Sequence, residues 1–164
     1  MTVHRDEGMT LIEMLTTLVI AGIIMATATW AIRDFIFANA ESGTAEQVQS
    51  ALRNAQEQSL SEGRTYCVYF TATTWTVYKS DCTVTADKTS GPNHVADSSI
   101  TLTSVAFPAP ETPVTGLNTA CPTTGQCAYF YPRGTALKGS LDVSRPGKTY
   151  VVNVEGLTGR VSMG

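Results

Sequence analysis

Four cysteines are the residues of this 164-residue chain with the most distinctive side-chain chemistry. Cys121 and Cys127 flank the short segment Pro-Thr-Thr-Gly-Gln, a tight loop that can bring their Cα atoms within bridging distance. Four cysteines allow three connectivities, and we favour Cys121–Cys127 together with Cys67–Cys82. In a regular hairpin Cys67 faces a residue near Tyr78, so Cys82 must curl back to reach it. The pattern predicts two disulfides and an oxidising compartment.

Metal binding and catalysis are the alternative uses of the polar residues. Neither cysteine pair has the C-x₂₋₄-C spacing of a zinc site, and His94 is the one histidine beyond the first eight residues. Asp81, Asp87 and Asp97 lack the spacing of an EF-hand, so we interpret them as a solvated loop rather than a calcium site. Serine-hydrolase, zinc-protease and glycine-rich phosphate-binding motifs are missing from the sequence. We therefore expect no enzymatic activity, no metal and no cofactor.

Basic residues concentrate towards the C-terminus. The whole chain has a formal net charge of −3, whereas residues 130–164 hold five bases against Asp142 and Glu155. Gathered on one face, these bases could contact phosphates and attract DNA in a salt-dependent way. Scattered, solvated bases are the alternative that we favour. The five are Arg133, Lys138, Arg145, Lys148 and Arg160.

A long apolar segment follows a short polar leader. No Lys or Arg occurs between residues 6 and 32, and residues 9–30 hold one charge, Glu13. As a helix this stretch is about 33 Å long, enough to cross a bilayer core. The small residues around Trp30 form a poor secretory cleavage site. The segment therefore predicts an uncleaved membrane anchor with an exported domain behind it, and it excludes a purely cytosolic soluble enzyme as the default.

The hexapeptide at residues 8–13, Gly-Met-Thr-Leu-Ile-Glu, narrows this interpretation. It resembles the prepilin signal of type IV pilins and type II secretion pseudopilins, whose usual form is Gly-Phe-Thr-Leu-Ile-Glu. The resemblance implies that prepilin peptidase cuts between Gly8 and Met9 and methylates Met9. It also implies that Glu13, the fifth mature residue, pairs with the N-terminal amine of a neighbouring subunit. The alternative is an interfacial Glu13 that reaches towards lipid headgroups.

The segment after the membrane stretch reads as an amphipathic helix. No proline precedes Pro92, and Gly63 supplies a helix stop. Arg53 and Glu57 have the spacing of an i,i+4 pair, and Ser42-Gly43 is the expected place for a local bend. The apolar stripe that should pack on a sheet consists of Ala45, Val48, Leu52 and Ala55.

The remaining chain reads as strands. Two loops are expected, a polar one at residues 83–99 and one that carries four prolines at residues 108–126. The runs rich in β-branched and aromatic residues, or alternating in polarity, are 64–71, 75–79, 100–107, 128–131, 140–144, 149–155 and 157–162. A long N-terminal helix packed on an antiparallel sheet is the pilin architecture.

The block from Tyr129 onwards adds a second resemblance. Its aromatic-x-Pro-x-Gly stretch and its late Thr-Gly-Arg-Val turn resemble the C-terminal region of H-type pseudopilins and T-type fimbrial minor pilins. Some T-type minor pilins of competence systems bind DNA through Gly-Arg-x-Arg. Here Gly159 and Arg160 match that motif, and Ser162 stands where the second arginine belongs.

We therefore expect an α+β, pilin-like protein in four parts. These are a leader at 1–8, a transmembrane and assembly half-helix at 9–32, an amphipathic half-helix at 33–63 and a β-rich domain at 64–164. The predicted function is that of a minor pilin or pseudopilin subunit of a type IV pilus or type II secretion system. Its partners are other pilins, prepilin peptidase and the inner membrane, with the C-terminal domain in the periplasm or outside the cell. A DNA-uptake minor pilin and a signal-anchored periplasmic domain without a filament are the alternatives.

Overall fold

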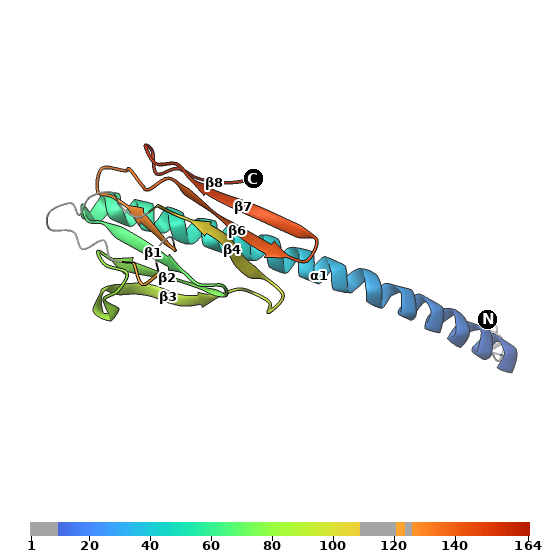
Figure 1. The fold of residues 1–164 in the computed structure, drawn as a ribbon. Helices are drawn as coiled ribbons and strands as arrows, with labels where there is room; N and C mark the ends of the chain where they lie inside the picture. The colour runs from blue at the N-terminus through green and yellow to red at the C-terminus, as the bar shows by residue number, and fades with distance from the viewer. Residues whose placement is uncertain (1–9, 109–120, 124–125) are drawn as a thin grey trace, which may run out of the picture. The chain divides into compact units, whose positions relative to one another are not determined.

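The computed structural model describes residues 10–108, 121–123 and 126–164. It divides into two compact units, Met1–Ala38 and Asn39–Gly164. Helix α1 (Leu11–Glu62) contributes to both units, and all the strands belong to the second (Figure 1).

Helix α1 ends where the sequence predicts. Gly63 has φ +63°, the left-handed conformation that terminates many helices and that glycine adopts without strain. The helix is assigned without interruption through Ser42 and Gly43, where a local bend was the expectation. Arg53 does not pair with Glu57, because its Nη2 donates instead to the carbonyl oxygen of Val161 at 3.1 Å.

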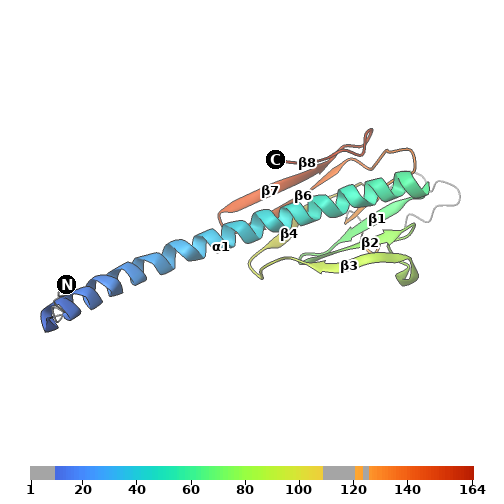
Figure 2. The same cartoon turned by 180° about the vertical axis from the view of Figure 1, so that it is seen from behind.

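The strands form two four-stranded sheets in which every described pairing is antiparallel. Sheet A has the order β3-β2-β1-β5 and contains β1 (Tyr66–Phe70), β2 (Thr74–Lys79), β3 (Lys88–His94) and β5 (Cys127–Phe130). Sheet B has the order β4-β6-β7-β8 and contains β4 (Thr101–Ala106), β6 (Gly139–Arg145), β7 (Lys148–Val154) and β8 (Val161–Met163). From Asn39 onwards, α1 lies across both sheets (Figure 2).

One core joins the helix to both sheets. The predicted stripe is confirmed, since Ala45, Val48, Leu52 and Ala55 are all 0% exposed. Alternation along the strands turns one face of each sheet towards this stripe. The strand residues of this core include Tyr66, Val68, Phe70, Trp75, Leu141, Val143 and Val152.

Two strand expectations need correction. Residues 83–99, expected as a loop, contain the short 3₁₀ helix η1 (Thr85–Asp87) and strand β3. The polar composition of β3 and its Gly91-Pro92 step are typical of a loop, which is why the sequence predicted one. Because β3 is an edge strand of sheet A, it needs neither an apolar face nor a complete hydrogen-bonding ladder. At the C-terminus, the expected strand at 157–162 is shorter and later, because a turn precedes β8. Most of the expected loop at 108–126 lies outside the described residues.

Candidate functional site

The N-terminal part of α1 presents an apolar surface. Among the described residues, Leu11–Ala28 is the one helical stretch long and apolar enough to cross a membrane. Its large apolar side chains are exposed, with Leu11 at 85%, Leu18 at 72% and Ile23 at 61%. Exposing so much contiguous apolar surface to water is unfavourable. This surface is therefore suited to contact with lipid or with other apolar helices.

Glu13, the one acid of this stretch, closes the first turn of the helix. The backbone N–H and the hydroxyl of Thr10 each donate to Glu13 Oε2 at 3.0 Å, and the Glu13 N–H donates to Thr10 Oγ1 at 3.4 Å. This reciprocal arrangement is a capping box, which satisfies N–H groups that have no partner within the helix. Both described hydrogen bonds to the carboxylate use Oε2.

The other polar side chains of the segment are satisfied within the helix. The Thr16 hydroxyl donates to the Glu13 carbonyl at 3.0 Å, and the Thr17 hydroxyl donates to the Met14 carbonyl at 2.9 Å. The Thr27 hydroxyl does the same to Ile24 at 3.0 Å. Such back-bonding lowers the cost of placing hydroxyls in hydrocarbon. Glu13 is left as the distinctive polar group of Leu11–Ala28. Gly8 and Met9, the expected processing residues, lie outside the described residues.

The cysteines form the two expected pairs. Cys67 is bridged to Cys82 and Cys121 to Cys127, with Cα–Cα separations of 5.8 and 5.9 Å. In register, Cys67 faces Tyr78 on β2, so the bridge is completed by the chain beyond β2. Burial, with the charge of Asp81 as a second cause, raises the pKa of Tyr129 beside these sulfurs and keeps its phenol neutral. The outer face of sheet A is thus a small apolar cluster of its own.

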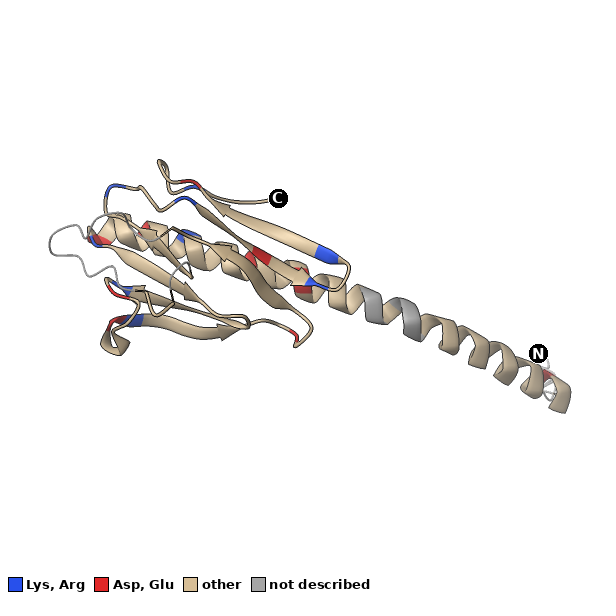
Figure 3. Ribbon diagram, in the orientation of Figure 1, with Lys and Arg blue, Asp and Glu red and all other residues tan. Residues whose placement is uncertain are grey.

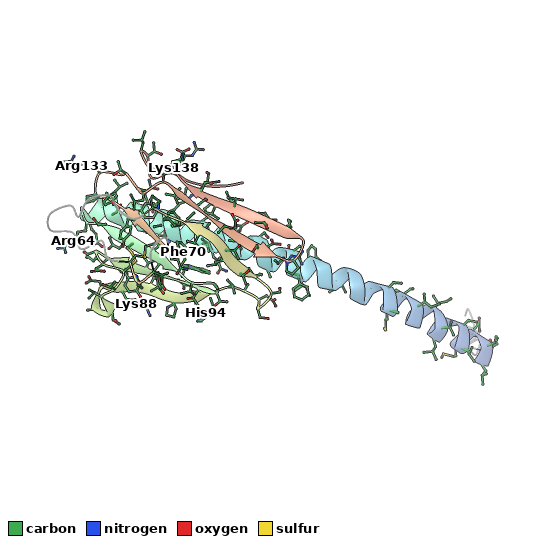
Figure 4. All side chains as sticks on the ribbon, viewed as in Figure 1. Arg64, Phe70, Lys88, His94, Arg133 and Lys138 are labelled. Atoms are coloured by element: carbon green, nitrogen blue, oxygen red, sulfur yellow. A yellow bond between two sulfur atoms is a disulfide. The ribbon has the colours of Figure 1, made fainter. Side chains whose placement is uncertain are left out.

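The acids considered for calcium have local roles. Asp81 Oδ1 accepts from the Thr83 N–H at 2.8 Å and from its hydroxyl at 2.7 Å. Asp97 Oδ1 accepts from the Ser99 hydroxyl at 2.6 Å and from its N–H at 2.8 Å, and these bonds lower the pKa of Asp97. Side chains of this kind stabilise turns. Asp87 belongs to η1, and His94 is an exposed residue at the end of β3 (Figure 4).

The five C-terminal bases fall into two groups. Arg145 and Lys148 face each other at the β6–β7 turn, whereas Lys138 precedes the opposite end of β6. Arg160 belongs with Lys138, because the adjacent Val161 pairs with Val154, and Val154 pairs with Gly139. At about 3.3 Å per residue, the seven-residue strand β6 separates the groups by roughly 20 Å. Figures 3 and 4 show basic residues at both ends of the domain, with Arg133 at the Lys138 end.

Arg145 is further committed to an internal ion pair. Its Nε lies 2.9 Å from Oε2 of Glu41, a side chain with 0% exposure on α1. Lys148, the base that faces Arg145 at this turn, has its Nζ 4.7 Å above the centre of the Tyr150 ring. The structure thus places two of the five bases at one end of β6 and the other three towards the opposite end, and it forms no single basic face from all five.

Two residues with structural roles at these sites escaped the sequence-based expectations. Thr10 caps the helix, and its signal was available as Thr-x-x-Glu within the hexapeptide. Glu41 pairs with a residue 104 positions away, for which a single sequence offers no signal.

Comparisons with known proteins agree on one class. The family model described as "Type II transport protein GspH" matches residues 44–158, and the model of the prokaryotic N-terminal methylation motif matches residues 3–29. The fold resembles that of the type IV minor pilin FimU of Pseudomonas aeruginosa, with a TM-score of 0.52 and 12% identity over 79% of this chain and 92% of that chain. It also resembles the minor pseudopilin EpsH of the Vibrio cholerae type 2 secretion system, with a TM-score of 0.51 and 12% identity over 75–76% of this chain and 93–94% of that one. A comparison with curated protein sequences finds no match.

A helix packed on two antiparallel sheets, preceded by a capped apolar segment with an N-methylation motif, defines the class of minor pilins and pseudopilins. Proteins of this class are structural subunits rather than enzymes. The chain belongs to the GspH family, whose model matches well over half of its length. Family membership implies assembly with other pilins and processing of the leader.

Proposed function

We propose that the chain is a minor subunit of a type IV pilus or a type II secretion pseudopilus, held in the inner membrane by a single helix before assembly. The observation that carries the proposal is the exposed apolar surface of Leu11–Ala28, interrupted by the single acid Glu13. Lipid covers this surface before assembly, and neighbouring subunits' helices cover it in the filament. The β-rich domain then lies in the periplasm or outside the cell.

Processing creates the group that Glu13 needs. We infer that prepilin peptidase cuts between Gly8 and Met9 and methylates the new amine of Met9. A charged carboxylate in hydrocarbon is unfavourable unless an opposite charge lies close to it. The capping bonds from Thr10 use Oε2 of Glu13, so Oε1 is the oxygen that we assign to the amine of a neighbouring subunit. This pairing neutralises both groups and sets the axial offset between subunits.

DNA uptake receives less support from the geometry. A DNA-binding surface needs several bases close enough to follow one phosphate backbone. Here the bases are divided between the two ends of β6, and Arg145 is occupied by Glu41. The half-motif Gly159-Arg160 stands at one end only. We therefore assign the domain to contacts with partner pilins.

Substitutions that separate helix capping from charge test the role of Glu13. Glu13→Gln keeps an oxygen that can accept the Thr10 bonds but removes the charge, whereas Thr10→Ala removes the cap and keeps the charge. We expect Glu13→Gln to insert normally into the membrane. We expect its amount in the sheared filament fraction to fall at least about tenfold, which corresponds to a loss of about 1.4 kcal/mol. We expect Thr10→Ala, a loss of about 0.5 to 2 kcal/mol in helix stability, to incorporate within about twofold of the wild type.

Quantitative immunoblotting of membrane and filament fractions measures both variants. Equal incorporation of Glu13→Gln and wild type would show that the charge has no assembly role. A Thr10→Ala defect as large as that of Glu13→Gln would assign the effect to the helix cap.

A further inference from the structure

Sulfur atoms from both disulfides meet on the outer face of sheet A. The Sγ atoms of Cys67, Cys82 and Cys127 all lie within 4.8 Å of one another, although Cys127 is bridged to Cys121. Strand register explains this proximity. Cys67 pairs with Tyr129 and Tyr69 pairs with Cys127 across β1 and β5, so Cys67 and Cys127 are diagonal neighbours on the same face. The two bridges are close enough for their sulfurs to react with one another after a small side-chain movement.

The four cysteines differ sharply in exposure. Cys67 is 0% exposed, and Cys82 and Cys127 are 2% exposed. Cys121 is partly exposed and lies outside the strands. Thiol–disulfide exchange requires a thiolate to reach a sulfur atom directly. A redox partner in solution can therefore attack Cys121, whereas the Cys67–Cys82 bridge is shielded from it.

We propose that Cys121 is the entry site for an external thiol or disulfide reagent, and that Cys127 relays the exchange to the buried Cys67–Cys82 bridge. The partner class is a dithiol–disulfide oxidoreductase or a small dithiol acting in its place. The proposal does not depend on the filament role, because it concerns only the sulfurs of the β-rich domain.

The reductive steps balance as follows. One thiolate of the dithiol attacks Cys121 Sγ, the Cys121–Cys127 bond breaks, and Cys127 leaves as a thiolate. The second thiol of the reagent displaces Cys121 as a thiolate and closes the reagent's own disulfide. The Cys127 thiolate then attacks one sulfur of the Cys67–Cys82 bridge, and the other sulfur leaves as a thiolate. Attack of Cys121 on Cys127 restores the exposed bridge and frees the second buried thiolate. A second dithiol then reopens the exposed bridge, so two dithiols are oxidised as four protein thiols form.

The same steps in reverse allow the buried bridge to close after sheet A has folded. Without a relay, the burial of Cys67 and Cys82 would require their bridge to form before the sheet does. Cys127 therefore has a role beyond its own disulfide. It connects a shielded pair to Cys121, the one partly exposed cysteine among the four.

Two single variants test the relay as a matched pair. Cys121→Ser and Cys127→Ser remove the same bridge, but only Cys121→Ser keeps the relay thiol. The full-length protein in detergent is treated with dithiothreitol under native conditions, quenched with iodoacetamide at intervals and mapped by mass spectrometry. We expect the Cys67–Cys82 bridge to disappear at least about tenfold faster in Cys121→Ser than in Cys127→Ser, because exchange within the fold replaces attack from solvent.

The wild type supplies a measurement that needs no variant. Its Cys121–Cys127 bridge should open first, and Cys121 should be the first cysteine alkylated. A bridge that contains Cys127 together with Cys67 or Cys82 should appear in Cys121→Ser. Equal rates of opening in the two variants, or opening of Cys67–Cys82 first in the wild type, would overturn the proposal.

Discussion

The buried ion pair between α1 and β6 gives the sharpest stability prediction for the β-rich domain. Arg145 Nε donates to Glu41 Oε2 at 2.9 Å, and the Glu41 side chain is 0% exposed. The second carboxylate oxygen, Oε1, has no described hydrogen-bond partner. Arg145→Ala would therefore leave a buried carboxylate without its only described side-chain partner.

The magnitude follows from this burial. Removing one member of a buried ion pair costs about 3 to 5 kcal/mol, because the remaining charge is still removed from water. For a chain of this size, 1 kcal/mol corresponds to about 2 to 4 °C in melting temperature. We therefore expect Arg145→Ala to lower the melting temperature by about 6 to 20 °C. Replacing both Glu41 and Arg145 by Met should recover most of this loss, since no buried charge remains.

Thermal unfolding of the detergent-solubilised full chain, followed by circular dichroism, measures the effect. Lys148→Ala is the matched control, because Lys148 faces Arg145 in register but is itself exposed, with its Nζ 4.7 Å from the centre of the Tyr150 ring. Loss of such a cation–π contact costs about 0.5 to 1 kcal/mol. If Arg145→Ala and Lys148→Ala lowered the melting temperature equally, the argument from burial would be refuted.

Three further outcomes are expected. Duplex DNA should bind the full chain weakly or not at all at about 0.15 M salt, where charges more than about 8 Å apart are largely screened from one another. Micromolar, Arg160-dependent binding in fluorescence anisotropy would contradict this. Gly139→Ala should lower the free energy of unfolding in urea by about 1 to 3 kcal/mol, because a Cβ there would lie 2.6 Å from the Ala106 carbonyl oxygen and overlap the Phe107 ring. An unchanged unfolding midpoint would contradict this close packing around Gly139. The ion pair with Lys79 lowers the pKa of Glu62 from 4.5, so its stabilisation is present above that pH and is lost as pH falls through the lowered value. A stability difference between Lys79→Met and wild type that persists in acid would contradict the sign.

Local pattern was sufficient to predict most elements of the fold. The stripe of Ala45, Val48, Leu52 and Ala55 is visible because helical periodicity and burial coincide. Strands β1 and β2 are visible because their residues are β-branched or aromatic and are separated by hairpin spacing. Such signals depend only on neighbouring residues, so a single sequence reveals them.

Features that depend on distant residues were not predictable in this way. Strand β3 is polar and contains Pro92, and only its pairing with β2 makes it a strand. The division into two sheets depends on which strands pair across long separations, as between β1 and β5. The pair of Glu41 and Arg145 likewise joins residues 104 positions apart.

The candidate site was predictable in its motif but not in its geometry. The hexapeptide at 8–13 identifies Glu13, yet the use of its Oε2 in the helix cap, on which the proposed role of Oε1 rests, emerges only from the contacts with Thr10. The basic residues illustrate the opposite case. Their excess in the sequence left a single basic surface open, although scattered bases were the favoured interpretation. Strand register separates them into two groups, because a sheet places residues by pairing rather than by proximity in the chain.

The intact mass of the membrane-extracted protein tests the central proposal most directly. A processed filament subunit should have the mass of a chain that begins at Met9 and carries one methyl group on its amine. The measurement is made in cells with an active prepilin peptidase, with a Gly8 variant that blocks cleavage as the control. A mass equal to that of the intact 164-residue chain in those cells would contradict the proposed processing and, with it, the pairing of Glu13 with a neighbouring amine.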